Sequence, residues 1–189
     1  MLTEGAKGMA GSIEKANELL DKNPNYICLG QFDNEDNPRA HYETTGPEIL
    51  KEVKDVSFIV AGIGSGGTIV GAGKFLKEKN KEIKVIGIEP KSSPLITENK
   101  SGPHKIQGIG ANFIPKIYDK DIVDKVITVS DEDSYETVRL IANKLGILIG
   151  ISSGANIFGA MKLSDENPDK IIVTVAPDGV DKYMSMGIF

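Results

Sequence analysis

The stretch VAGIGSGGTIVGAG, residues 60–73, constrains the fold of the rest of the chain. It places six glycines in the twelve residues from Gly62 to Gly73, and it continues the apolar run SFIVA of residues 57–61. Glycine lets the backbone turn sharply and approach other groups closely, at an entropic cost that a simple turn would not require. An apolar strand followed by such a turn and a helix is typical of a site where backbone N–H groups bind a phosphate.

The pattern on either side of this turn predicts an α/β fold. Short apolar runs bounded by glycine, proline or polar residues indicate buried strands, and apolar residues at helical spacing indicate helices. The expected strands are residues 57–61, 84–90, 124–130 and 170–179, with one more at the start of 147–163. The expected helices are residues 9–20, a helix capped by Thr45, residues 68–80 and 131–146, and the end of 147–163. Because successive strand, helix and strand form a parallel βαβ unit, we expect a mainly parallel twisted sheet with helices on both faces.

The N-terminal part of the chain carries a second apolar run. YICLGQF, residues 26–32, predicts a strand, and DNEDNPRA, residues 33–40, predicts a polar loop. The single cysteine, Cys28, lies in the apolar run, with no disulfide partner and no metal-ligand spacing. We therefore expect Cys28 to pack in the core.

Charge and composition exclude several classes of protein. The net charge is −5, and the 22 basic residues are scattered, whereas a nucleic-acid surface needs them clustered. No apolar run reaches the length of a membrane span, and MLTEGAKGM lacks the pattern of a signal peptide, so the sequence predicts a cytoplasmic protein. His41 and His104 have no paired ligand spacing, and we expect no metal site.

The glycine-rich turn has more than one interpretation. A Walker A loop is excluded, because Gly67 is followed directly by Thr68 without the required lysine. Gly62, Gly64 and Gly67 do satisfy the dinucleotide fingerprint G-x-G-x-x-G, and Glu89 ends the next strand, where such a fold places its ribose-binding acid. This short motif is weak on its own, and a tight turn without a ligand is a further alternative.

The third interpretation is a cup for a single phosphate group. Its members are Gly64, Ser65, Gly66, Gly67 and Thr68. Small consecutive residues at a helix start can turn their N–H groups toward an anion, and the two hydroxyl groups add donors. Such a nest binds a dianionic phosphate without a lysine. The turn alone leaves these interpretations open.

Several segments, taken in order, resemble one enzyme family. They are TEGAKGM (3–9), QF-x-N (31–34), TTGPEI (44–49), AGIGSGGT (61–68), GIEP (87–90), GPHKIQGIGA-x-F-I-P (102–115), DKVI (124–127) and GI-x-x-GISSGA (146–155). This set is similar to the cysteine synthases, or O-acetylserine sulfhydrylases. They belong to the pyridoxal-phosphate-dependent β-family of fold type II, with cystathionine β-synthase and the tryptophan synthase β subunit. The resemblance covers essentially the whole chain.

The resemblance implies a role for particular residues. Gly64, Ser65, Gly66, Gly67 and Thr68 would hold the phosphate of pyridoxal 5′-phosphate, and Ser152 would meet its pyridine nitrogen. Gln31 and Phe32 would face the substrate, and the loop Gly108, Ile109 and Gly110 would move over it. The implied reaction is β-replacement, in which O-acetylserine and sulfide give cysteine and acetate. A hydroxyl partner at the ring nitrogen makes the ring a weaker electron sink, which suits this chemistry.

The resemblance also implies what this chain lacks. No lysine here matches the family's cofactor-binding lysine, so we assign no catalytic residue and expect a fragment that lacks the N-terminal part of the fold. Residues 1–35 would then be a remnant of a smaller domain, and 36–189 the cofactor-phosphate-binding domain. Ala176 to Ser185 departs from the cysteine synthase pattern toward cystathionine β-synthase-like relatives, and Asn112 stands where the family often has glycine. The alternatives are therefore another β-replacement enzyme or a non-catalytic binding module.

Two kinds of partner also follow from the resemblance. The full-length parent would be a homodimer, and its cleft would receive the C-terminal tail of serine acetyltransferase. We expect no nucleic-acid or membrane partner.

Overall fold

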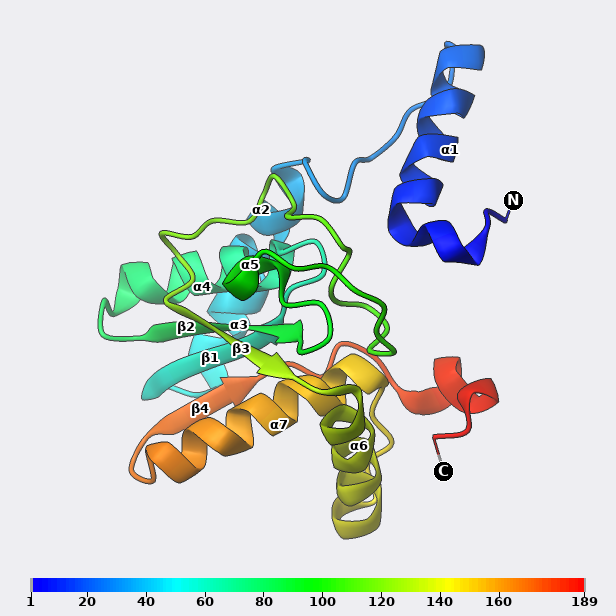
Figure 1. Cartoon of the computed structure of the whole chain (residues 1–189). Coiled ribbons are helices and arrows are strands. Elements are labelled where there is room, and N and C mark those ends of the chain that lie inside the picture. The colour runs from blue at the N-terminus through cyan, green and yellow to red at the C-terminus, as the bar shows by residue number, and fades with distance from the viewer. Residues whose placement is uncertain (1, 189) are drawn as a thin grey trace.

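The computed structural model describes residues 2–188 and is built on a four-stranded parallel sheet (Figure 1). The strands are β1 (Val56–Gly62), β2 (Lys84–Pro90), β3 (Lys125–Val129) and β4 (Ile171–Thr174). Their order across the sheet is β3-β2-β1-β4, and in the central register Val60 pairs with Ile86 on one side and with Thr174 on the other. The two central strands are apolar along most of their length, because both faces of a parallel sheet are covered.

Helices cover the two faces of this sheet, as the sequence predicts. One layer contains α2 (Asp36–Glu43), α3 (Thr45–Glu52) and α4 (Gly67–Lys79), and the other contains α6 (Asp131–Leu145) and α7 (Ile151–Glu166). Successive residues of β1 face opposite layers, so that Ile59 joins the cluster with Leu76 of α4 and Val60 joins the cluster with Ala155 of α7. The predicted α/β fold class is confirmed.

The connections show where the sequence-based boundaries were wrong. Only α5 (Leu95–Glu98) forms within residues 91–124, which are otherwise irregular. The strand expected at the start of 147–163 is reduced to one antiparallel bridge, between Ile149 and Gly179. The C-terminal strand ends at Thr174, and η2 (Val180–Met186) follows. Thr45 is the first residue of α3 and not its cap.

The polar loop expected at residues 33–40 is partly helical, since α2 begins at Asp36. The Asn34 side chain accepts a hydrogen bond from the Asp36 backbone N–H (2.9 Å), and Pro38 lies in the first turn, where its missing N–H costs nothing. These are ordinary helix-start signals that the polar composition conceals.

The N-terminal elements lie apart from the sheet (Figure 1). They are η1 (Gly5–Lys7) and α1 (Gly8–Lys22), joined to α2 by an extended segment. The strand predicted at residues 26–32 is wrong: Tyr26, Ile27 and Leu29 are exposed and no strand pairs with them in the described part of the chain. Cys28 is likewise exposed, so its predicted core position is wrong. A β-prone run becomes a strand only when a neighbour accepts its hydrogen bonds and covers its side chains.

None of the helices among residues 2–188 is both long and apolar enough to cross a membrane.

Candidate anion-binding site at the glycine turn

The glycine turn lies where β1 ends and α4 begins, at the carboxyl edge of the sheet. Gly66 adopts the left-handed φ of +91° that directs the chain into α4. The loop of residues 108–110 packs directly against the turn, and the Gly110 N–H donates to the Ile63 carbonyl (3.0 Å). A Cβ at Gly64 would overlap with the Gly108 carbonyl oxygen, so only glycine allows this approach.

A cavity of about 130 Å³ opens between this turn, the 108–110 loop and the start of α7. Its lining consists of Ala61, Gly62, Gly64, Ser65, Gly66, Gly67, Thr68, Gly108, Ile109, Ser152, Asn156, Val175 and Pro177. The structure therefore brings together all five predicted cup residues, Ser152 and two of the three predicted loop residues. Gln31, Phe32 and Gly110 lie outside the lining. Sequence reasoning did not identify Asn156, Val175 and Pro177.

The electrostatics of this cavity favour an anion at the turn. Within the described chain, no lysine, arginine or carboxylate lines it. The backbone N–H groups at the start of α4 have no intrahelical acceptor and point toward the turn. The positive end of the helix dipole adds to them, and the hydroxyl groups of Ser65 and Thr68 are further donors.

The opposite wall of the cavity contains two buried polar residues, one of which has an unpaired atom. Asn156 is 2% exposed; its amide nitrogen donates to the Val175 carbonyl (2.8 Å), while its Oδ1 has no hydrogen-bond partner among residues 2–188. Buried polar atoms are almost always paired, so an orphaned one in a cavity wall indicates a missing ligand or water. Ser152, one helical turn before Asn156, is also buried and lines the same cavity.

The start of α7, which carries Ser152, is fixed by the C-terminal segment. The Asp178 carbonyl accepts from the Gly150 N–H (2.8 Å) and from the Ser153 hydroxyl (3.3 Å). The Asp178 carboxylate accepts from the Tyr183 hydroxyl (2.6 Å). Burial, together with this hydrogen bond, raises the pKa of Tyr183 to about 12. The C-terminal segment that contains Asp178 and Tyr183 thus anchors the helix that forms one wall of the cavity.

The dinucleotide interpretation does not fit this geometry. Glu89 is 2% exposed, and its carboxylate accepts hydrogen bonds from the backbone N–H groups of Ile96 (2.9 Å) and Thr97 (3.1 Å) and from the Thr97 hydroxyl. A carboxylate that binds the start of α5 in this way is not available to a ribose. The fingerprint G-x-G-x-x-G is therefore present, but the acidic residue that would bind the ribose of a dinucleotide is not free to do so.

The two histidines have structural partners. His104 Nε2 lies 2.8 Å from the Gly110 carbonyl, and His41 lies between the hydroxyls of Thr45 and Thr68. No group of three potential metal ligands occurs in residues 2–188. Asn112 has a φ of +63°, a left-handed conformation that asparagine tolerates better than most residues.

A larger open groove lies away from this site. It has a volume of about 1250 Å³ and lies between α2, α4 and residues 114–121. Its lining mixes acidic and basic side chains and contains no cup residue. The cavity at the glycine turn is smaller, but its lining combines a helix N-terminus with an unpaired buried polar atom, and this combination indicates a ligand.

Comparison with known proteins defines the class. Residues 2–178 match the family model described as "Pyridoxal-phosphate dependent enzyme", and the chain belongs to this family. Its relatives include the cysteine synthase B of Campylobacter jejuni, 47% identical over the whole chain and 63% of that protein, and the cysteine synthase A of Escherichia coli, 44% identical over the whole chain and 62% of that protein. The chain thus spans about 63% of the length of these curated relatives.

Solved structures agree with this placement. The cysteine synthase of Entamoeba histolytica superposes with a TM-score of 0.94 at 40% identity, covering all of this chain and 57% of that one. The O-acetylserine dependent cystathionine β-synthase of Helicobacter pylori has a TM-score of 0.95 at 40% identity, covering all of this chain and 62% of that one. The predicted resemblance is confirmed.

Proposed function

We propose that this chain binds pyridoxal 5′-phosphate at the glycine turn and forms the cofactor-phosphate-binding part of a cysteine synthase. The family model is that of pyridoxal-phosphate-dependent enzymes, and the named relatives are cysteine synthases. The observation that carries the proposal is the cavity itself, whose lining includes a helix start, two hydroxyls, Ser152 and Asn156, and the Oδ1 of Asn156 is unpaired. This arrangement suits a ligand with an anionic end and a polar ring.

Each wall of the cavity has its own role in this proposal. The α4 N-terminus and the hydroxyls of Ser65 and Thr68 donate hydrogen bonds to the phosphate. The Ser152 hydroxyl meets the ring nitrogen, and because a hydroxyl is a weak acid it leaves that nitrogen largely unprotonated. The cofactor supplies an electron sink for replacement at the β-carbon of an amino acid.

The remaining site residues belong to the substrate side. Gly108 and Ile109 wall the cavity next to the turn, and with Gly110 they form the proposed mobile loop. Gln31 and Phe32 remain proposed substrate-facing residues. Phe32 packs edge-on against Phe113, with ring centroids 4.8 Å apart, and so contacts the residues that follow the loop.

Catalysis requires groups that this chain does not place at the cavity. None of the described residues that line it is a lysine, so no residue here is assigned as the covalent partner of the cofactor. We propose that O-acetylserine and sulfide are the substrates of the complete active site, which includes a polypeptide segment equivalent to the remaining third of the relatives. The similarity to an O-acetylserine dependent cystathionine β-synthase supports a second candidate, in which a larger thiol is the acceptor.

The other partner and domain assignments rest on the resemblance alone. They are a homodimeric parent, a cytoplasmic location, binding of the serine acetyltransferase tail, and a boundary near residue 35. Chromatography with light scattering tests the homodimer, and a pull-down with a peptide of that tail tests the binding-module alternative. Absence of binding by the folded chain would count against the latter.

The direct test is titration of the chain with pyridoxal 5′-phosphate, followed by calorimetry and absorbance. We expect saturable binding at one site per chain and much weaker binding of pyridoxal, which lacks the phosphate. Ser152→Ala should shift the absorbance of the bound cofactor, whereas Ser164→Ala, at an exposed position of the same helix and outside the lining, should not. Equal affinities for the two ligands would overturn the phosphate assignment.

A second assay tests the reaction. The chain is mixed with the N-terminal third of a relative, and cysteine formation from O-acetylserine is measured with sulfide or homocysteine as acceptor. Activity with sulfide supports the first candidate, and activity only with homocysteine supports the second. A folded complex that binds the cofactor and converts neither would exclude both.

A further inference from the structure

Two glycines of α4 allow α2 to pack unusually close to the cup. A Cβ at Gly67 would overlap with Asn37 Oδ1, and a Cβ at Gly71 would overlap with the Pro38 carbonyl oxygen. These glycines lie one turn apart on the same face of α4. They are therefore required for the approach of α2, which brings α2 side chains to the back of the glycine turn.

Two residues of α2, on the side that packs against α4, each contact one hydroxyl of the cup. Asn37 Nδ2 lies 2.9 Å from Ser65 Oγ, and His41 Nε2 lies 3.1 Å from Thr68 Oγ1. Asn37 and His41 are four residues apart, which places them on one side of the helix. Both hydroxyls that face the cavity are thus held from behind by a single helix.

The contacts of Asn37 determine which way the Ser65 proton points. Its amide group also lies 2.7 Å from the Gln31 carbonyl, which can only accept, so the amide presents its NH₂ protons to both Gln31 and Ser65. Ser65 Oγ also accepts from the Gly67 N–H (3.4 Å). A hydroxyl has two acceptor positions and one proton. With both acceptor positions in use, the Ser65 proton is left to donate to a ligand.

In the same way, the contacts of His41 determine which way the Thr68 proton can point. Its Nδ1 lies 2.9 Å from Thr45 Oγ1, and burial lowers the pKa of the imidazole, which keeps the ring neutral at pH 7. A neutral ring has one N–H, so one tautomer donates to Thr68 and the other accepts from it. Only when Nε2 carries the proton is the Thr68 hydroxyl free to donate into the cavity.

We propose that Asn37 and His41 are positioning residues that turn the Ser65 and Thr68 hydroxyl protons toward a bound phosphate group, with His41 as the Nε2–H tautomer. This inference deepens the proposed cofactor site and rests on it for the identity of the anion. Asn37 also connects the cup to the Gln31 segment, so occupancy of the cup stabilises the segment that is proposed to face the substrate.

The tautomer of His41 is tested without any cofactor. Long-range ¹H–¹⁵N spectra of the free chain distinguish the two forms, and His41→Gln assigns the signals. His104 is an internal reference, because its Nε2 faces the Gly110 carbonyl and must carry the proton. We expect both imidazoles to show the Nε2–H pattern. The Nδ1–H pattern at His41 would overturn the assignment for Thr68.

The orientation of Ser65 is tested with Asn37→Asp. The substitution is nearly isosteric, but it replaces the donor to Ser65 with an acceptor that draws the Ser65 proton away from the cavity. The matched control is Asn34→Asp, which adds the same charge nearby, where Asn34 contacts the Leu29 carbonyl and Asp36. We expect pyridoxal 5′-phosphate to bind roughly 10-fold to 100-fold more weakly to Asn37→Asp than to the control, since hydrogen bonds to charged groups are the strong ones.

The outcomes separate the two proposals. A wild-type chain that does not bind pyridoxal 5′-phosphate overturns the proposed function, while the tautomer measurement still decides the role of His41. If the wild-type chain binds and Asn37→Asp binds as well as Asn34→Asp, the positioning role is overturned. His41→Leu should also weaken phosphate-dependent binding, and His41→Gln, whose amide N–H can donate to Thr68, should restore part of it. Equal binding by both His41 variants would count against orientation, whether or not Asn37→Asp folds.

Discussion

Two short apolar runs of this chain have similar composition, but only one of them forms a strand. Residues 57–61 form most of β1, which lies between β2 and β4 and buries Ile59 completely. Residues 26–29 have a similar composition, yet Ile27 is 86% exposed and the segment is extended without a partner. The difference shows that strand formation depends on neighbours on both sides more than on the run itself.

The same contrast extends to the glycines. Gly71 lies under α2, where a side chain would overlap with the Pro38 carbonyl, whereas a Cβ on Gly5 would meet nothing within 4 Å. At these two positions, the sheet region leaves no space for a side chain and the N-terminal region does. Substitutions placed in matched pairs across the two regions measure this difference.

The largest effect is expected for Ile59→Ala compared with Ile27→Ala. Removing the fully buried Ile59 side chain should lower the free energy of unfolding by about 2–5 kcal/mol, because transfer and cavity terms add. Ile27→Ala should change it by less than about 0.5 kcal/mol, as is usual for exposed positions. Urea denaturation monitored by circular dichroism provides both values. A large loss for Ile27→Ala would show that the exposed segment packs against the rest of the chain.

A smaller effect is expected for Gly71→Ala compared with Gly5→Ala. The new methyl group at position 71 must displace α2, which should cost about 1–3 kcal/mol of unfolding free energy and weaken binding of pyridoxal 5′-phosphate. Gly5→Ala should leave both unchanged within error. Denaturation and titration on the same samples measure the two quantities. Unchanged binding by a destabilised Gly71→Ala would separate the packing of α2 from its proposed effect on the cup.

The fold was predictable where local pattern and tertiary context agree. Residues 84–90 were predicted as a strand with the observed bounds, because that run is apolar and lies between β1 and β3. Residues 26–32 were mispredicted, since sequence does not reveal whether a partner strand is present. The α2 helix was missed because the residues at its start, Asn34 and Pro38, are of types that are also common in loops.

The candidate site was predictable to a similar extent. The cup residues and Ser152 are marked by small residues at a helix start, and the structure brings them to one cavity. No comparable sequence pattern identifies Asn37 and His41. Their position depends on how closely two helices approach, and this is set by contacts of Gly67 and Gly71 that no local pattern encodes.

A still smaller effect is expected from the ion pair that joins Lys77 of α4 to Asp124, the residue before β3. Asp124 accepts from Lys77 Nζ (2.8 Å) and from the Val85 N–H (2.8 Å). Burial alone would raise the pKa of Asp124, but Lys77 and this N–H outweigh it and hold the pKa below its ordinary value of 3.8. Asp124→Asn should therefore lower the free energy of unfolding at pH 7 by about 1 kcal/mol, since the pair is partly exposed.

The stabilising contribution of Asp124 should decrease as the pH is lowered. Because the folded pKa is depressed, the contribution of Asp124 is complete above pH 3.8 and is lost as the pH falls through the folded pKa. The difference between wild type and Asp124→Asn should shrink as the pH is lowered, whereas an exposed control, Asp55→Asn, should show little difference throughout. A constant difference from pH 7 to pH 2.5 would mean that the effect comes from packing and not from charge.

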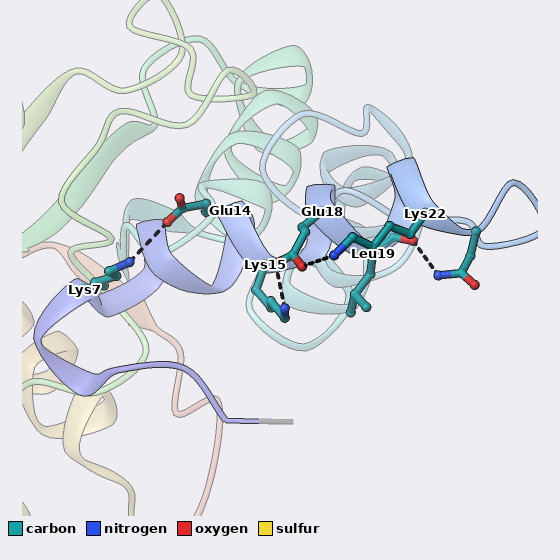
Figure 2. A network of polar contacts seen from close by, with 7 residues as sticks. Lys7, Glu14, Lys15, Glu18, Leu19 and Lys22 are labelled. Atoms are coloured by element: carbon teal, nitrogen blue, oxygen red, sulfur yellow. Dashed lines mark hydrogen bonds and ion pairs between the residues drawn. The ribbon is translucent and has the colours of Figure 1, made fainter.

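The smallest effect on global stability is expected in α1. Glu18 lies 2.6 Å from both Lys15 and Lys22, and these exposed pairs are drawn in Figure 2. Hydrogen bonds from Lys15 and then Lys22 lower the pKa of Glu18 from 4.5 to about 2. The stabilising contribution to α1 is thus complete above pH 4.5 and is lost as the pH falls through about 2.

NMR titration of the Glu18 carboxyl carbon measures this directly. We expect a midpoint well below 4.5 at low ionic strength that rises toward 4.5 in 1 M salt, because exposed charges are screened over a few ångströms there. Lys15→Gln should raise the midpoint more than Lys22→Gln, following the order of the two hydrogen bonds. The urea midpoint of the sheet region should not change in either variant, because α1 lies apart from the sheet. A coupled change in both quantities would instead show that α1 docks on the sheet region in solution, and would remove the distinction between the two parts of the chain.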